Sequence, residues 1–598
     1  MTDKRFPNPF EIEGPDGVDG WEELYPYSVT FGEGRREYEE NRFWFWDSMH
    51  WGTAMTPWDS TFFETAIATL SQMNSRHYRI PPADGIDFRV LYGYAYLSPV
   101  GVDPEKIEPR VPQFMERAGH YFANWDDLYE KWLVKVKGSI DEIESLNFAP
   151  LPEMEDLSVI TEGLAVGSGA GLVSSYNRFK DLIIQVWQYH FEFLNLGYAA
   201  YLDFFGFCKE AFPSIPDLGI AKMVAGVEVD LFRPNEELKV LARKAIDLGI
   251  ARAFDDPGNV DLSGDAGAQF QAAWDEVADP WFNFTSGNGF YHFDEIWREH
   301  PEVPYAFIKD YITKIEAGED ISRPIDAIRA ERDRIVEEYR DLLATDEDRE
   351  AFDGKLGLAR VVFPYVENHN FYIEHWTMSV VWRKVRELGA TLSKDGLLGA
   401  DDDLLYLRLN EVDEVLWDYY CNWAVNAPTA SKAHWAPIIE RRREIHAKLK
   451  AWNAPKALGE PPEVITEPFT IMLWGITTDS VSTWLGSDDD VDGQISGMAA
   501  SPGSVEGLAR LVFSPDDVGE IEDGEILVAP ITAPSWAPVF PKIRACVTDI
   551  GGMMSHAAIV CREYSVPAVT GTGFGTDRIK TGDRIRVDGS SGTVTILD

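Results

Sequence analysis

A glycine pair followed by a Ser-His pair forms the segment of this chain with the clearest chemical meaning. The apolar run 545–547 predicts a strand, Gly551 and Gly552 follow it, and Ser555-His556 opens an Ala/Ile/Val-rich run that predicts a helix. Backbone N–H groups and the positive dipole end at a helix N-terminus favour an anion. The same field disfavours imidazolium, so a neutral, nucleophilic His556 ring is favoured near pH 7. A histidine that accepts and passes on a phosphoryl group needs both properties.

This segment resembles the phosphohistidine swivelling domain of the PEP-utilising enzyme family, which includes PEP synthase, pyruvate phosphate dikinase, rifampin phosphotransferase and phenylphosphate synthase. The family pattern is roughly T-D-x-G-G-x-x-S-H-A-A-I-V-A-R-E. The positions that match it are Gly551, Gly552, Ser555, His556, Ala557, Ala558, Arg562 and Glu563. The resemblance implies that His556 carries the phosphoryl group and that Gly551, Gly552 and Ser555 support it. Ser555 could equally cap the helix, and the alternative for His556 is a capping or core histidine.

Bulk composition limits the classes of function. A chain of 598 residues is too long for one core, so two to four domains are expected. The net charge of −46 argues against nucleic acid and anionic membrane surfaces as partners. The N-terminus does not resemble a signal peptide and no run of 18 apolar residues occurs, so a cytoplasmic protein is expected. Four scattered cysteines indicate neither a zinc site nor a disulfide framework, and no metal ligands are assigned.

The chain is expected to be multidomain, with a mainly α-helical acceptor-binding domain followed by a compact β/α domain. A Gly/Ser/Asp-rich stretch predicts a flexible linker at 486–496. Beyond it, domain 497–598 contains short β-type runs, which are 509–513, 526–530, 584–587 and 593–597. Domain 1–485, expected as one domain or as two subdomains, is aromatic-rich. Its predicted elements include helices at 325–343 and 371–388, a helix stop at Gly389, and a strand at 404–409.

A second, weaker resemblance concerns the central stretch. Ala359-Arg360, Glu387-Leu388-Gly389 and 402–407 are similar to the acceptor-binding domain that precedes the histidine domain in rifampin phosphotransferase and phenylphosphate synthase. The chain contains neither a P-loop pattern nor the motifs of the family's ATP-grasp domain. The resemblance therefore implies that ATP and Mg²⁺ are used at a partner ATP-grasp subunit, which charges His556. The isolated chain is expected not to use ATP.

An aromatic cluster near the N-terminus is the candidate acceptor site. Its aromatic and polar members are Trp44, Trp46, Asp47, His50, Trp51 and Trp58. An aromatic pocket with a few polar groups suits a small aromatic ligand, although ordinary aromatic core is the alternative. We select His50 as the acceptor-side base. His375 is a further candidate for substrate binding, on an apolar stripe that also fits a core histidine, and Arg383 is a candidate phosphate ligand. His369, just before the helix predicted at 371–388, and Glu374, within it, are further candidates for facing the acceptor.

Three functions remain open from the sequence. The leading hypothesis is a phosphotransferase subunit that carries an ATP-derived phosphoryl group on His556 and transfers it to the hydroxyl of a small, phenol-type acceptor. The second is transfer to an antibiotic or another alcohol. The third is a non-catalytic carrier or binding module. A phenolic hydroxyl has a pKa of about 10 and gains from a nearby general base, which is the reason for seeking a histidine at the acceptor site.

Overall fold

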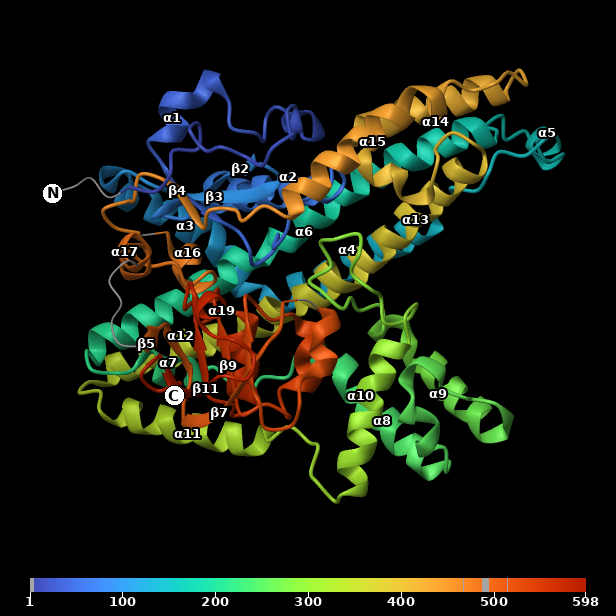
Figure 1. Ribbon diagram of the computed structural model, residues 1–598. Coiled ribbons are helices and arrows are strands. Elements are labelled where there is room, and N and C mark those ends of the chain that lie inside the picture. Colours follow the sequence, from blue (N-terminus) through green and yellow to red (C-terminus); the bar gives the residue numbers. More distant parts are fainter. Residues whose placement is uncertain (1–4, 466, 487–493, 514, 598) are drawn as a thin grey trace.

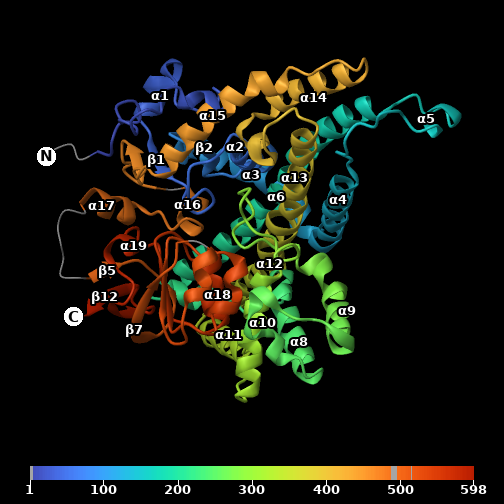
Figure 2. The ribbon, with the colours of Figure 1, turned by 45° about the vertical axis from the view of Figure 1, so that its right-hand side comes forward.

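The computed structural model describes residues 5–465, 467–486, 494–513 and 515–597. The chain is multidomain, as expected: a mainly helical N-terminal region is followed by a β/α domain (Figure 1). In both views the C-terminal domain lies on the opposite side of α16 and α17 from the N-terminal sheet (Figures 1 and 2). Within the described part of the chain, no helix combines the length and apolar character needed to cross a membrane.

A four-stranded antiparallel sheet lies at the start of the chain. Its order is β2-β3-β1-β4, with bounds β1 Phe43–Trp46, β2 Ala83–Leu91, β3 Tyr94–Gly101 and β4 Ala457–Gly459. Strand β1 lies between β3 and β4, so Trp44 and Phe45 are completely buried. Because β4 comes from the far end of the helical region, residues distant in sequence meet beside β1.

Most of the N-terminal region is helical. The longest element is α6, Ser168–Ala211, which packs against α2, Asp59–Gln72, and α12, Asp346–His369. The other helices of at least fifteen residues are α3 Pro104–Ala123, α4 Trp125–Ser145, α8 Arg233–Asp247, α9 Gly264–Trp281, α10 Glu302–Glu316, α11 Ile325–Asp341, α13 Met378–Lys394, α14 Leu409–Trp423 and α15 Ser431–Lys450.

Two predictions for the central stretch are wrong. Gly389 does not stop a helix, because α13 continues to Lys394; a Cβ at Gly389 would lie 2.2 Å from the carbonyl oxygen of Asp401, so close packing requires glycine there. The segment 404–409 is not a strand: a 3₁₀ helix, Asp401–Tyr406, leads into α14. Its apolar residues are buried against α13, and a short apolar run does not distinguish a strand from a buried turn.

The C-terminal domain contains an eight-stranded sheet of order β5-β12-β11-β7-β8-β9-β10-β6. Its bounds are β5 Gln494–Ser496, β6 Met498–Ser501, β7 Ser504–Leu511, β8 Ile526–Ala529, β9 Ala545–Thr548, β10 Ala568–Thr570, β11 Arg584–Asp588 and β12 Thr593–Leu597. Each predicted β-run therefore overlaps a strand, although 509–513 matches only the end of β7, and α18, His556–Glu563, follows β9 as predicted.

Residues 487–493, most of the predicted linker, lie outside the described residues. The described ends of that segment are regular structure rather than linker. Gly486 ends α17, Thr478–Gly486, and Gln494–Ser496 form β5, which pairs with β12 at the edge of the sheet.

The C-terminal domain is docked on the N-terminal region. The backbone N–H groups of Gly551 and Gly552 donate to the carbonyls of Trp474 and Leu473 at 3.2 and 2.8 Å. A Cβ at Gly552 would lie 2.1 Å from the carbonyl oxygen of Met472, so this approach requires glycine. The loop that leads to His556 is thereby held against the segment that follows α16, Pro468–Met472.

Candidate active site

His556 is the first residue of α18, and Ser555 is its N-cap, whose hydroxyl accepts from the backbone N–H of Ala558 at 3.5 Å. The Nδ1 atom of His556 lies 3.5 Å from Oγ1 of Thr532. Its Nε2 atom is enclosed and has no hydrogen-bond partner. Burial lowers the pKa of His556 from 6.5 to about 3, so the ring is neutral at pH 7. A neutral ring with an unpartnered nitrogen has the properties of a nucleophile.

The His556 ring lines a cavity at the boundary between the two regions. The space has a volume of about 1110 Å³, including its open mouth. The C-terminal domain contributes the segment 531–534 together with the His556 loop, and the N-terminal region contributes the rest. The aromatic side chains of that second part are Trp51, Trp187, Phe191, Tyr198, Phe290, Phe469 and Trp474. The cavity can therefore enclose a small aromatic molecule beside His556.

His50 lines the same cavity as one half of a His–Asp pair. Its Nδ1 atom is 2.9 Å from Oδ2 of Asp47, which is fully buried directly after β1. Trp474 donates its indole N–H to the other side of this carboxylate at 2.8 Å. Although burial lowers the pKa of His50, the adjacent Asp47 carboxylate raises it above the ordinary value overall. Asp47 thus orients the His50 ring and strengthens it as a base.

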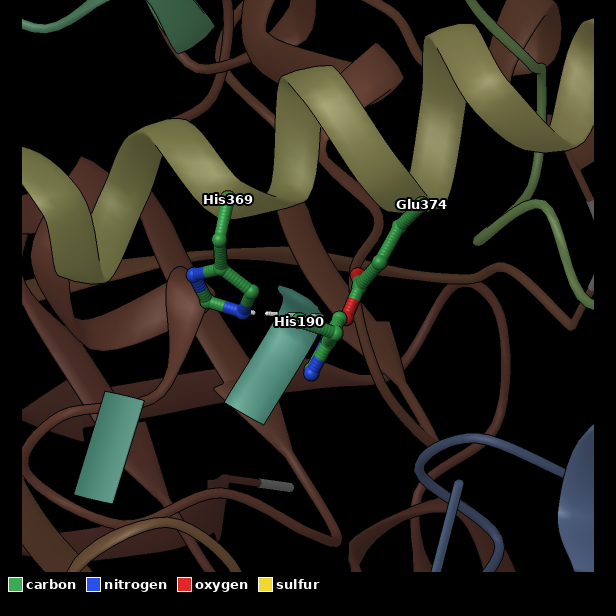
Figure 3. Close-up of side chains that lie close together, drawn as sticks. All are labelled: His190, His369 and Glu374. Atoms are coloured by element: carbon green, nitrogen blue, oxygen red, sulfur yellow. Dashed lines mark hydrogen bonds and ion pairs between the residues drawn. The ribbon is translucent and has the colours of Figure 1, made fainter. Parts of the chain in front are cut away.

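A second polar group on the cavity wall combines His190 of α6 with His369 and Glu374. The Nε2 atom of His190 is 2.9 Å from Oε1 of Glu374, and Nε2 of His369 is 3.8 Å from the same oxygen (Figure 3). Burial lowers the pKa of each of these histidines to about 3, and burial raises the pKa of Glu374. The cavity therefore holds two neutral imidazoles beside a carboxyl group.

The cavity unites some of the residues selected from the sequence. His556, Ser555, His50 and Trp51 line it, and Asp47 lies behind His50. Gly551 and Gly552 shape the docking contact, where their N–H groups are already bonded to carbonyls.

Other selected residues lie elsewhere. Trp44 and Trp58 are core residues, and Trp46 donates its indole N–H to the carbonyl of Trp51. His375 is buried outside the cavity lining, bonded to Thr285 at 2.8 Å and stacked on Phe284. Arg383 forms ion pairs with Glu144 and Glu299, so the structure does not support a phosphate-binding role there.

The sequence reasoning missed most of the remaining wall. Trp187 and His190 lie on α6, whereas Phe290 and Trp474 come from segments far from it in the chain, and none belongs to a local motif. The sequence did point to His369 and Glu374, because His369 lies just before the helix predicted at 371–388 and Glu374 lies within it. In the structure His369 ends α12, and Glu374 lies in a π-helix, Asn370–Thr377, that joins α12 to α13.

A family model and several known proteins match parts of this chain. Residues 521–592 match the family described as PEP-utilising enzyme, mobile domain. The chain is similar to a probable phosphoenolpyruvate synthase of Staphylothermus marinus, with 48% identity over 102 residues, or 17% of this chain and 12% of the relative. It is also similar to a rifampicin phosphotransferase of Streptomyces sp, with 30% identity over 305 residues, or 50% of this chain and 31% of the relative.

A longer match is the Chondramide synthase cmdD of Chondromyces crocatus, 25% identical over 569 residues, covering 93% of this chain and 14% of that protein. The chain thus spans about a third or less of each of these relatives. These matches support the resemblance, seen in the sequence, to the PEP-utilising enzyme family and to its rifampicin phosphotransferase members.

The buried histidines make the stability of the fold depend on pH. Burial lowers the pKa of His375 to about 3, against 6.5 when the ring is exposed. Between these values only the unfolded chain binds the proton, so the contribution of His375 to stability is present above pH 6.5 and is lost as pH falls. The free energy of unfolding of the wild-type chain should therefore fall as pH falls below 6.5. His375→Gln cannot titrate, so the slope of this fall should be smaller by up to about 1.4 kcal/mol per pH unit. Urea unfolding at pH 7.5, 6 and 5 measures this difference; equal slopes would contradict it.

Proposed function

We propose that this chain is a phosphotransferase component that carries a phosphoryl group on His556 and transfers it to a hydroxyl in the cavity. The observation that carries this proposal is the unpartnered Nε2 of His556, on a ring that lines an aromatic cavity built mostly by the other region. The match of residues 521–592 to the PEP-utilising enzyme mobile domain and the similarity to a rifampicin phosphotransferase support it.

The transfer step needs an acceptor oxygen in line with the P–N bond of phosphohistidine. The acceptor oxygen forms a bond to phosphorus, the P–N bond breaks, and its electron pair returns to the imidazole of His556. The hydroxyl proton passes to Nε2 of His50, whose Nδ1–H donates to Asp47. The products are the phosphorylated acceptor and neutral His556.

The proposed acceptor is a small hydroxylated aromatic. Trp51 stacks on Phe290 with an interplanar angle of 22°, and Trp187 lies beside the same ring. Flat aromatic walls with a few polar groups favour a planar apolar ligand over a flexible polar one. An antibiotic-like or other alcohol acceptor is the alternative, since a relative of this chain is named for rifampicin.

The phosphoryl group is proposed to come from ATP through a separate ATP-grasp subunit with Mg²⁺. The docked arrangement encloses His556 in the acceptor cavity, so charging requires the C-terminal domain to leave.

An acceptor screen tests the proposal. The full chain, a candidate ATP-grasp partner, Mg-ATP and single acceptors would be incubated, and phosphorylated products measured by mass spectrometry. The panel pairs phenols with cyclohexanols of similar size and adds rifampicin. We expect phenols to be phosphorylated; cyclohexanols used equally well would refute the aromatic preference, and no product with any acceptor from a charged chain would favour a carrier or binding module.

A salt bridge across the docking interface offers a test of movement. Nζ of Lys542 lies 2.8 Å from Oδ2 of Asp310, and both side chains are partly buried. Lys542→Asp should weaken the docking of the C-terminal domain by about 1 kcal/mol and thereby slow transfer to the acceptor roughly fivefold. Charging of His556 at the partner should not slow, because that step uses the undocked domain.

The charge-swapped variant Lys542→Asp with Asp310→Lys is the matched control, and it should recover the transfer rate. Single-turnover kinetics from the charged chain measure transfer separately from charging. A transfer rate unaffected by the single substitution, or a swap that fails to rescue it, would count against docking as the productive state.

A further inference from the structure

We propose that His190, His369 and Glu374 form a site for one divalent metal ion of the zinc class on the wall of the acceptor cavity. Their ligand atoms all lie within 4.8 Å of one another, and all three residues line the cavity (Figure 3). Two histidines and one carboxylate that leave a coordination position open are the ligand set of catalytic zinc sites.

The backbone is arranged to bring two of these ligands together. His369 and Glu374 are five residues apart, and in an α-helix such residues point roughly 140° away from each other. Here His369 precedes the π-helix Asn370–Thr377, whose wider i→i+5 turn stacks positions five apart. Both side chains therefore extend from one helix towards His190 (Figure 3). Short π-helical turns within α-helices frequently occur at functional sites.

The orientation of His369 is that of a metal ligand. Its Nδ1 atom lies 3.3 Å from the carbonyl oxygen of Tyr365, to which only a protonated Nδ1 can donate. The lone pair of the neutral ring is then on Nε2, the nitrogen that faces Glu374. Metal-binding histidines generally hold their ring in this way, with the second nitrogen bonded to a carbonyl or carboxylate.

The group is short of positive charge without a cation. Among the described residues, the ion-pair partners of Glu374 are His190 and His369 alone, so no lysine or arginine pairs with this carboxylate. A bound cation would compensate the carboxylate and accept the lone pair of His369 Nε2.

Only small movements would close the site. Zinc lies about 2.0–2.2 Å from nitrogen and oxygen ligands, so ligand atoms around a tetrahedral ion are roughly 3.4 Å apart. The separations of Glu374 Oε1 from the two Nε2 atoms, 2.9 and 3.8 Å, lie on either side of that value. Side-chain rotation alone can supply the adjustment.

The role of the ion rests on the proposed function. None of the described residues that line the cavity is lysine or arginine, although a phosphoryl group in transfer needs its oxygens neutralised. A metal ion at this wall would supply that charge, and it would also lower the pKa of a hydroxyl bound at its open position. The site would therefore select acceptors whose hydroxyl group can reach the metal ion.

Metal binding by the chelator-treated full chain tests the site without any measurement of activity. Zn²⁺ titration by calorimetry should show one equivalent per chain, and Co²⁺ should give the visible absorption of a low-symmetry, four- or five-coordinate ion. His369→Gln and Glu374→Gln should each weaken binding by at least roughly 100-fold, the upper end for loss of an outer-shell partner. His300→Gln is the matched control, because His300 contacts Glu295 and Glu302 but lies outside the cavity lining.

The outcomes separate this inference from the proposed function. Absence of stoichiometric Zn²⁺ binding, or wild-type affinity in His369→Gln and Glu374→Gln, would overturn the metal site even if phosphoryl transfer occurs. One equivalent of Zn²⁺ that both substitutions remove would uphold it even if no acceptor is phosphorylated. Circular dichroism of each metal-free variant shows that it is folded, and Glu374→Asp, which keeps the charge on a shorter side chain, should restore part of the affinity if Glu374→Gln is misfolded.

Discussion

Replacing His556 with alanine should abolish the acid-labile phosphoryl label on this chain. The substitution removes the unpartnered Nε2 at the start of α18 but keeps a small, helix-favouring residue there. Because the nucleophilic nitrogen is lost, we expect labelling from ATP and the ATP-grasp partner to fall by at least about 10³-fold. Radiolabelled ATP, followed by acid and alkaline treatment of the trapped protein, measures this.

His434→Ala is the matched control, because His434 is an exposed histidine outside the cavity lining. It should be labelled like the wild-type chain, and both variants should unfold at similar temperatures. Label that persists in His556→Ala would show that another residue carries the phosphoryl group.

Replacing His50 with glutamine should separate the two half-reactions. Charging of His556 should continue, because His50 lies on the acceptor side of the cavity. Transfer to the acceptor should fall by about 10²- to 10⁴-fold, the usual contribution of a general base. Because Asp47 raises the pKa of His50, wild-type transfer should decline as pH falls through that raised value and the base becomes protonated. His50→Gln should lose this dependence.

The chain provides a matched control for this experiment. His292 pairs with buried Asp59 at 3.2 Å, much as His50 pairs with Asp47, but it does not line the cavity. His292→Gln should therefore leave the rate and pH profile of transfer near the wild-type values. Equal effects of the two substitutions would indicate that His–Asp pairs matter here for folding, and loss of charging in His50→Gln would contradict the assignment of His50 to the acceptor step.

Much of the C-terminal domain could be predicted, because the residues that determine each of its elements are close together in the sequence. The strand, glycine pair, Ser-His pair and helix lie within twenty consecutive residues, and each element follows from its own residues. The strands of the domain are likewise separated by glycine and proline turns. Predictions failed where packing overrides local preference. Gly389 was predicted to end a helix, but it lies within α13, where the absence of a side chain allows the carbonyl of Asp401 to approach closely.

The sequence by itself determined the C-terminal domain, the position of His556 at a helix start, and the mainly helical character of the rest. Only the tertiary structure decided which residues share the cavity with His556. His50, His190, His369 and Trp474 stand far apart in the chain, and the aromatic cluster near the N-terminus contributes Trp51 to the wall while Trp44 and Trp58 enter the core. Side-chain burial and ring orientation depend on the packing of many elements together, and no local pattern of residues encodes that packing.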